Sequence, residues 1–196
     1  MTSTFNRVDS HTDTYLTFTL EDETFAVEVA NVREVLDYIT ITKVPRTPDF
    51  MRGVINLRGA VVPVVDMRAR FGMPQIEDTV DTCIIVMEIS YDGESTVIGA
   101  VADSVNEVFD VSSDNIEPPP QIGTSLDLDF IKGMGKYNEQ FIIILDINMV
   151  FSDLELETVK EISEHAPVLA GEAPLYETAD VDAVAKGSDS PAEATP

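Results

Sequence analysis

Apolar and polar residues alternate with a period of two in several short stretches of the chain. Leu16, Phe18 and Leu20 alternate with threonines, and a similar alternation follows the polar turn 21–23. This period is typical of β-strands with one buried face, whereas the unbroken apolar run 82–89 is typical of a strand buried on both faces. The strands predicted in this way cover residues 16–20, 25–29, 54–57, 61–65, 82–89, 97–102, 105–111, 130–137 and 141–145.

The stretch 53–72 contains the most informative local pattern. Two apolar runs flank the dipeptide Arg58-Gly59, which predicts a tight β-hairpin with an arginine at its tip. After the hairpin, Asp66 is predicted to cap a short helix that Gly72 ends with a left-handed residue. The turn needs a glycine but not an arginine, so Arg58 is a candidate functional residue. The alternative interpretation is an ordinary solvated side chain.

A short helix is predicted over residues 31–36. Asn31 and Glu34 have the spacing of a capping box, with Glu34 as the capping side chain. Three apolar residues in this segment share one helical face, which by default packs in the core. This apolar face consists of Val32, Val35 and Leu36.

Two further helices are predicted from local signals. The Thr-Pro dipeptide at 47–48 indicates a one-turn helix that ends at Gly53. Ser152 and Glu155 match a capping box more closely than any other pair, which predicts a terminal helix over 153–164.

Short, closely spaced strands with brief helices between them favour a mainly β fold of small closed barrels over a parallel sheet. The length of 196 residues suits one domain of about 150 residues with additional terminal segments. Residues 1–13 have little apolar pattern and are predicted to be a flexible N-terminus. Residues 165–196 are rich in Ala, Glu, Asp and Pro, which predicts a disordered acidic tail.

The chain is strongly acidic. It has 36 acidic and 12 basic residues, which give a formal net charge of −24. Such a charge repels phosphate backbones and anionic lipids, so neither nucleic acid nor a membrane surface is expected as a partner. No apolar run reaches the length of about 20 residues that a membrane helix needs, and the N-terminus does not resemble a signal peptide. The protein is therefore predicted to be cytoplasmic.

The side chains that most enzymatic and metal sites need are scarce. The two histidines, His11 and His165, lie in the polar ends, and the single cysteine, Cys83, lies in an apolar run where an inert buried thiol is expected. This inventory disfavours a histidine base, a zinc site and cysteine–histidine chemistry. Carboxylates are abundant but nothing selects a pair, so acid–base chemistry by carboxylates stays open. No catalytic, cofactor-binding or metal-ligating residue is predicted, and the sequence favours a protein that binds.

Other polar motifs have structural interpretations. The G-x-G sequence at 133–135 lacks the rest of a dinucleotide fingerprint and is interpreted as a bulge or a close approach of strands. Asp103 is interpreted as a turn residue. Arg68 and Arg70, on the short helix after the hairpin, are predicted to form a local basic patch near Arg58.

Six motifs follow one another along the predicted domain. The longest is T-P-D-F-M-R-G-V-I-N-L-R-G-A-V-V-P-V-V-D-M-R at 47–68. The shorter ones are Y-L-T-F-T-L at 15–20, V-R-E-V at 32–35, G-A-V-A-D-S-V at 99–105, I-E-P-P-P at 116–120 and I-K-G-M-G at 131–135. In this order they resemble the CheW family of chemotaxis coupling proteins, over about residues 14–158.

The resemblance implies a fold of two small SH3-like β-barrels that share an apolar core, with short helices and a C-terminal helix, within residues 14–164. It implies an adaptor without enzymatic activity or cofactor. The implied partners are the regulatory domain of a CheA-type histidine kinase and the cytoplasmic hairpin tip of chemoreceptors, so that the protein links receptor state to kinase activity.

The resemblance also implies four partner-binding residues. The arginine of the family's N-L-R-G motif falls on Arg58, and further partner-facing positions fall on Val32, Glu34 and Val108. Val32 would then be an exposed contact rather than a core residue, and Glu34 would contact a partner rather than only cap a helix.

Two alternatives stay open from the sequence. One is a small-ligand-binding protein or enzyme that uses the crevice between the two barrels. The other is a barrel that binds single-stranded nucleic acid, which the net charge of −24 disfavours.

Overall fold

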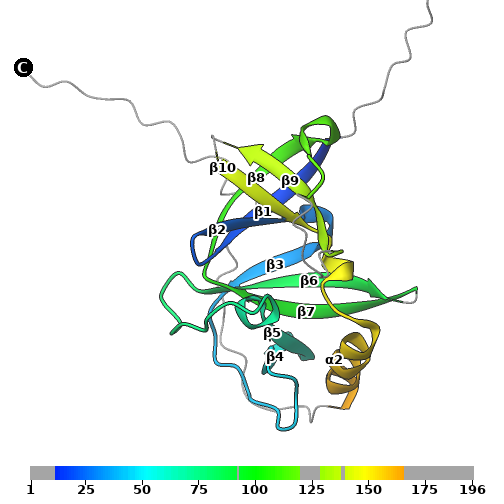
Figure 1. Ribbon diagram of the computed structural model, residues 1–196. Coiled ribbons are helices and arrows are strands. Elements are labelled where there is room, and N and C mark those ends of the chain that lie inside the picture. The colour runs from blue at the N-terminus through cyan, green and yellow to red at the C-terminus, as the bar shows by residue number, and fades with distance from the viewer. Residues whose placement is uncertain (1–11, 92, 120–128, 138–139, 166–196) are drawn as a thin grey trace, which may run out of the picture.

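The computed structural model describes residues 12–91, 93–119, 129–137 and 140–165 (Figure 1). Within these residues the chain forms ten β-strands, two α-helices and three short 3₁₀ helices. The expected mainly β fold is confirmed. Of the predicted flexible N-terminus 1–13, residues 1–11 lie outside the described residues and the last two belong to a strand. Of the predicted disordered tail 165–196, residues 166–196 lie outside the described residues and His165 is the last residue of a helix. The first strand already begins at Thr12.

The strands form two five-stranded sheets, which Figure 1 shows one above the other. The first sheet has the order β8 (Ser104–Ser112), β1 (Thr12–Leu20), β2 (Glu23–Glu28), β10 (Gln140–Leu145) and β9 (Ile131–Tyr137). The second sheet has the order β3 (Val32–Asp37), β6 (Cys83–Tyr91), β7 (Glu94–Ala102), β5 (Ala60–Asp66) and β4 (Met51–Leu57). Neighbouring strands are antiparallel except for the parallel pairs β2–β10 and β5–β7.

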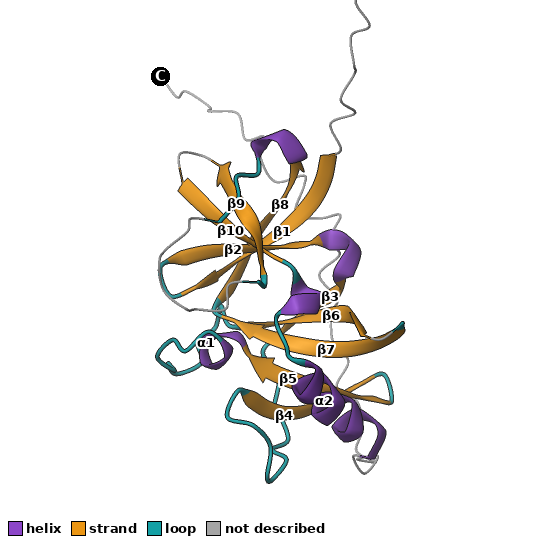
Figure 2. Ribbon diagram, turned by 45° about the vertical axis from the view of Figure 1, so that its right-hand side comes forward, coloured by secondary structure: helices purple, strands orange, loops and turns teal. Residues whose placement is uncertain are grey.

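The chain crosses from one sheet to the other twice before it ends in a helix. It forms β1 and β2 in the first sheet, β3 to β7 in the second, β8 to β10 in the first again, and ends with helix α2 (Asp153–His165). Helix α2 lies against the second sheet beside β5 (Figure 2). The other short elements are the 3₁₀ helices Val29–Asn31, Ser113–Asn115 and Ile147–Met149 and the α-helix α1 (Met67–Arg70).

Apolar side chains form three clusters, one of which belongs to both sheets. The first sheet has a small cluster around Tyr15 and Ile144, and the second sheet has one around Val64 and Ile84. The third and largest cluster, called the shared core below, lies between the sheets and also takes in α2. Its members include Phe18, Phe25, Leu145, Ile85, Met87, Leu156 and Val159. The expected apolar core common to two β subdomains is therefore confirmed.

The predicted helix over residues 31–36 is wrong. These residues begin at the end of a 3₁₀ turn and continue as β3, which pairs with β6. Val35 packs against the shared core, whereas Leu36 packs in the cluster of the second sheet. Successive residues of a strand point to opposite faces, which explains why these two neighbouring side chains pack in different apolar clusters. A six-residue segment is also too short to be a stable helix without strong packing.

The predicted one-turn helix that ends at Gly53 is also wrong. A single turn, closed by the Met51 amide donating to the Pro48 carbonyl at 2.9 Å, leads directly into β4. Gly53 has φ +141°, and a Cβ at this position would lie 2.1 Å from the carbonyl oxygen of Thr42. Gly53 therefore allows the 38–44 segment to approach β4 closely, and this approach explains the glycine better than a helix end does.

Several local predictions are confirmed. The Asp66 side chain caps α1 by accepting a hydrogen bond from the Ala69 amide at 3.1 Å, and Gly72 has φ +69° just after the helix. Glu155 accepts hydrogen bonds from the amide and hydroxyl of Ser152, both at 2.8 Å, at the start of α2. The predicted strand 82–89 corresponds to most of β6, and its residues are buried on both faces except for Glu88.

Cys83 is buried in the shared core at the start of β6, as expected. Burial raises the pKa of its thiol to about 12, so the folded protein keeps it protonated and unreactive at neutral pH.

This raised pKa predicts that stability falls in mildly alkaline solution. Above an ordinary thiol pKa of about 8.5, the unfolded chain loses the proton while the folded chain keeps it, so the free energy of unfolding declines as pH rises. Urea unfolding at pH 8 and at about pH 10 should show a loss about 2 kcal/mol larger for the wild type than for Cys83→Ala. Equal pH dependence of the two proteins would contradict this assignment.

Candidate functional site

The tip of the β4–β5 hairpin is built from Arg58 and Gly59, as the sequence predicts. Leu57 pairs with Ala60, which leaves a two-residue turn. Both turn residues have positive φ, +52° for Arg58 and +89° for Gly59, as in a type I′ turn. Such turns favour Asn or Asp followed by Gly, and a left-handed conformation strains an arginine. A strained, exposed residue is a reason to look for function at the tip.

Arg58 forms an ion pair with Glu34 across the end of the second sheet. The distance between Arg58 Nη2 and Glu34 Oε2 is 2.9 Å, and the Arg58 side chain is 69% exposed while that of Glu34 is 17% exposed. Glu34 lies on β3 and Arg58 follows β4, and these are the two outer strands of the sheet. The sheet therefore curls so that its outer strands approach each other, as in a small barrel. The carboxylate of Glu34 holds the guanidinium of Arg58 in place.

A groove with a volume of about 460 Å³ lies beside this ion pair. Its walls come from β3, the β4–β5 hairpin, the first half of β7 and the end of α2. Three cations line it, Arg33, Arg58 and Lys160, together with apolar side chains that include Val61 and Val97. No pattern in the sequence points to Arg33 or Lys160. Recognising β3 as a strand would have placed Arg33 on its exposed face, but nothing in the sequence shows that α2 lies across β5.

The four predicted partner-binding residues do not form one cluster. The structure brings together Arg58 and Glu34, and Val32 lies two residues before Glu34 on the same strand. Val32 is half-buried and packs against the shared core, so it is less exposed than the resemblance implied. Val108 is 37% exposed and lies on β8, an outer strand of the other sheet. Arg58 and Glu34 thus belong to the second sheet, whereas Val108 belongs to the first.

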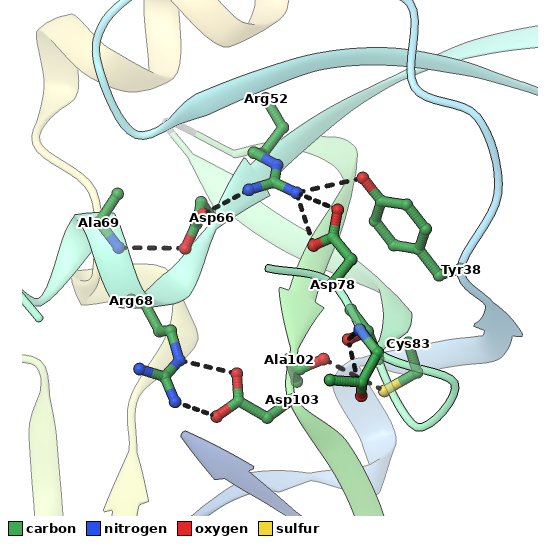
Figure 3. A network of polar contacts seen from close by, with 11 residues as sticks. Tyr38, Arg52, Asp66, Arg68, Ala69, Asp78, Cys83, Ala102 and Asp103 are labelled. Carbon is green, nitrogen blue, oxygen red and sulfur yellow. Dashed lines mark hydrogen bonds and ion pairs between the residues drawn. The ribbon is translucent and has the colours of Figure 1, made fainter. Parts of the chain in front are cut away.

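The base of the β4–β5 hairpin is fixed by Arg52 (Figure 3). Its guanidinium donates to Asp66 at 3.1 Å, to both carboxylate oxygens of Asp78 at 2.7 and 2.8 Å, and to the Tyr38 hydroxyl at 3.1 Å. Burial opposes the charge of Arg52, but the hydrogen bond to Tyr38 and the two carboxylates raise its pKa above the ordinary value. Arg52 therefore remains a cation that ties β4, β5 and two flanking segments together below the tip.

The predicted basic patch of Arg68 and Arg70 near Arg58 is wrong. The Arg68 side chain is only 8% exposed and donates to Asp103 through Nε at 2.7 Å and Nη2 at 2.5 Å, as Figure 3 shows. The hydrogen bond to Asp103 raises the pKa of Arg68 despite its burial. Arg70 donates to the Val150 carbonyl at 2.8 Å and pairs with Glu155. Arg68 and Arg70 are close to Arg58 in the sequence. The sequence does not show that carboxylates and a carbonyl from distant parts of the chain bind them.

Asp103 joins the two subdomains, which is more than the turn role expected for it. Besides Arg68 after β5, it accepts the Glu21 amide of the β1–β2 turn at 2.6 Å. Its own amide donates to the Thr19 carbonyl at 3.1 Å. Asp103 lies between β7 of the second sheet and β8 of the first. Its carboxylate therefore connects both sheets at the point where the chain crosses between them.

Within the part of the chain that the structure describes, no group of three or more His, Cys, Asp or Glu residues could hold a metal ion. The helices there are also too short or too polar to cross a membrane.

The motif order, the two curled sheets and the arginine at the hairpin tip agree with a known family. The model of the CheW-like domain family matches residues 14–155. The chain belongs to this CheW-like family. The chemotaxis protein CheW of Rhizobium meliloti is 35% identical over 142 residues, which cover 72% of this chain and 89% of that protein. The chemotaxis protein CheW of Klebsiella aerogenes is 31% identical over 150 residues, which cover 76% of this chain and 88% of that protein.

The fold has a counterpart of known structure. The crystal structure of the scaffolding protein TtCheW from Thermoanaerobacter tengcongensis matches with a TM-score of 0.65 and 33% sequence identity, over 78% of this chain and 96% of that chain. The CheW-like resemblance drawn from the motifs and the expected fold class are confirmed. The roles of Arg58, Glu34, Val32 and Val108 in binding stay predictions.

The strain at the hairpin tip predicts that Arg58 is not optimal for stability. Replacing it by Asn, which adopts the left-handed conformation more readily, should raise the free energy of unfolding by about 0.5–1 kcal/mol. The lost ion pair with Glu34 is a small opposing effect because Arg58 is largely exposed. Urea unfolding of Arg58→Asn measures the difference. A clear loss of stability would mean that the ion pair outweighs the strain and that Arg58 is structural.

Breaking the Arg68–Asp103 pair, in contrast to replacing Arg58, should lower the free energy of unfolding. Asp103→Ala leaves the nearly buried guanidinium of Arg68 without its carboxylate and should cost about 2–3 kcal/mol, a value reduced because Asp103 is 21% exposed. Glu94→Ala, which breaks an exposed pair with Lys160, should cost less than about 1 kcal/mol. Adding Arg68→Met to Asp103→Ala should recover part of the loss in urea unfolding, because it removes the unpaired charge. Similar losses for Asp103→Ala and Glu94→Ala would show that the buried pair is unimportant.

Proposed function

We propose that this protein is a non-enzymatic chemotaxis adaptor that couples the cytoplasmic tips of chemoreceptors to the regulatory domain of a CheA-type histidine kinase. Its membership of the CheW-like family supports this role, as do the names of its relatives, chemotaxis proteins and a scaffolding protein. The protein would work in the cytoplasm, recruited to receptor arrays at the membrane.

The observation that carries the proposal is the presentation of Arg58. The side chain is 69% exposed, sits on a strained turn and is held by a carboxylate that is mostly covered. A guanidinium fixed in this way loses little side-chain entropy when a partner binds. Arginine is also among the residues that most often dominate the binding energy of an interface. We therefore place the kinase contact at Arg58 and Glu34, with Val32 beside them on β3.

Val108 supports a second contact face. It is exposed on β8, in the subdomain that does not carry Arg58. An adaptor has to bind more than one partner at once, and contacts on two rigidly joined subdomains allow this without competition. Individually modest contacts then act together in an array, because linked binding sites raise the effective concentration of each other.

The alternative of a small-ligand site needs a crevice between the two subdomains. The 460 Å³ groove instead belongs to the second sheet and α2. A small pocket near Arg52 and Asp103, with a volume of about 10 Å³, is far below the size of a ligand site. The adaptor is therefore the function that the described residues support best.

Charge reversal at Arg58 tests the proposal. Arg58→Glu should weaken binding to the kinase regulatory domain at least about 30-fold in calorimetry, since an arginine at the centre of an interface contributes about 2 kcal/mol or more. Arg46→Glu is a matched control, because Arg46 is also an exposed arginine with positive φ, +66°, and does not line the groove. Circular dichroism should show both variants folded.

A charge swap separates a binding role from a structural one. Glu34→Arg combined with Arg58→Glu restores an internal ion pair of opposite polarity. If Arg58 acted only through Glu34, the swap would recover kinase binding; because it contacts the partner, binding should stay weak. Wild-type protein that fails to bind the kinase domain at high concentration, although folded, would refute the proposed function.

A further inference from the structure

The groove beside Arg58 lies next to the point where the chain leaves the described fold. Ser163 and Glu164, in the last turn of α2, both line it. The Ser163 hydroxyl donates to the Val61 carbonyl at 3.2 Å, which fixes the end of α2 on the first residues of β5. The described part of the chain therefore ends at the wall of the groove.

The lining of the groove differs in charge from the protein as a whole. Arg33, Arg58 and Lys160 contribute three positive charges, against two negative charges from Glu34 and Glu164, so the lining itself carries a net charge of +1. Glu88 and Glu94, which lie outside the lining, pair with Arg33 and Lys160. The whole chain carries −24. Arg33 and Arg58 have side-chain exposures of 51% and 69%, so their guanidinium groups face solvent although each forms an ion pair. Each guanidinium has five N–H donors, more than one carboxylate can accept.

One segment of the remaining chain has the complementary chemistry. Residues 172–184, E-A-P-L-Y-E-T-A-D-V-D-A-V, contain four carboxylates and no cation. Leu175 and Tyr176 form an apolar pair within it, suited to the apolar walls of the groove at Val61 and Val97. The intervening residues 166–171 can span about 20 Å, at up to about 3.5 Å per residue, so the segment reaches the groove easily.

We propose that residues 172–184 dock into the groove of the same chain and cover Arg58. Leu175 and Tyr176 contact the apolar walls, and the carboxylates of the segment bind the guanidinium groups of Arg33 and Arg58. Because the segment is tethered, its effective concentration is on the order of 1 mM, so even a weak contact is substantially occupied. The docked tail competes with any partner that uses Arg58. This regulatory consequence rests on the proposed function, whereas the docking itself does not.

Paramagnetic labelling of the full chain tests the docking. Cys83 is buried with a strongly raised thiol pKa, so a maleimide spin label attaches selectively to an introduced cysteine. A label at Thr178→Cys should broaden the amide signals of Ala60, Val61, Thr96 and Val97 in an ¹H–¹⁵N spectrum. A label at Ser190→Cys, outside the segment, should broaden them much less. Raising the salt from about 0.1 M to about 1 M, which shortens the Debye length from about 10 to about 3 Å, should reduce the effect.

Two outcomes of this experiment would overturn the docking. One is broadening that is absent or spread evenly over the surface. The other is broadening of the same size when ¹⁵N-labelled chains without a spin label are mixed with spin-labelled chains without ¹⁵N, which would mean that the tail binds a second copy. Glu177→Gln with Asp180→Asn and Asp182→Asn, on the Thr178→Cys background, should weaken the broadening if the carboxylates bind the cations.

Calorimetry with the kinase regulatory domain tests the competition. Replacing the four carboxylates, Glu172→Gln, Glu177→Gln, Asp180→Asn and Asp182→Asn, should tighten binding about two- to tenfold, because an internal competitor that is about half to nine-tenths bound is removed. Asp189→Asn with Glu193→Gln, in the same tail, should leave the affinity unchanged. Unchanged affinity in the first variant, with docking observed, would overturn the competition. Failure of every chain to bind would refute the proposed function and leave the docking to be judged by the labelling alone.

Discussion

The shared core is the constraint on which the whole molecule depends. Each five-stranded sheet has only a small apolar cluster of its own, and the largest cluster needs side chains from both sheets and from α2. Small sheets rarely bury enough apolar surface to be stable alone. The chain also crosses from one sheet to the other twice, so the first sheet is made from two separate segments, β1–β2 and β8–β10, on either side of the second. The two subdomains therefore fold and hold together as one body, and contacts on either sheet keep a fixed relation to contacts on the other.

Stability supplied by the core leaves the hairpin tip free to carry a residue that the turn does not favour. The base of the hairpin is fixed by Arg52, whose four hydrogen bonds reach Asp66, Asp78 and Tyr38. The tip itself is strained at Arg58 and depends on Asn56, whose side chain accepts the Gly59 amide at 2.9 Å. A rigid base and a strained tip are typical of a surface selected for what it presents rather than for its own stability.

Patterns that depend on neighbours in sequence could be predicted, and those that depend on distant partners could not. The β4–β5 hairpin, the Asp66 cap and the Ser152–Glu155 cap are local and were found in the sequence. The prediction of a helix over 31–36 was wrong because a segment of six residues fits a helical and a strand pattern equally well. Only pairing with β6 decides between the two. The burial and pairing of Arg68 depend on Asp103, which is 35 residues away in the sequence, so they could not be predicted from local patterns. Arg58 and Glu34 could be selected from the family's motifs. The groove that adjoins them could not be predicted, because it depends on where α2 packs.

The acidic composition changes how the arginines should be interpreted. With 36 acidic and 12 basic residues, almost any cation will find a carboxylate, so an ion pair alone says little about its role. Exposure separates the cases. Arg52 and Arg68, at 23% and 8%, hold elements of the fold together, whereas Arg33 and Arg58, at 51% and 69%, face the same groove. Long-range attraction steers acidic partners only toward cations that solvent can reach. On a strongly acidic protein, the groove is therefore a place where an acidic segment can bind, whether it belongs to a partner or to the chain itself.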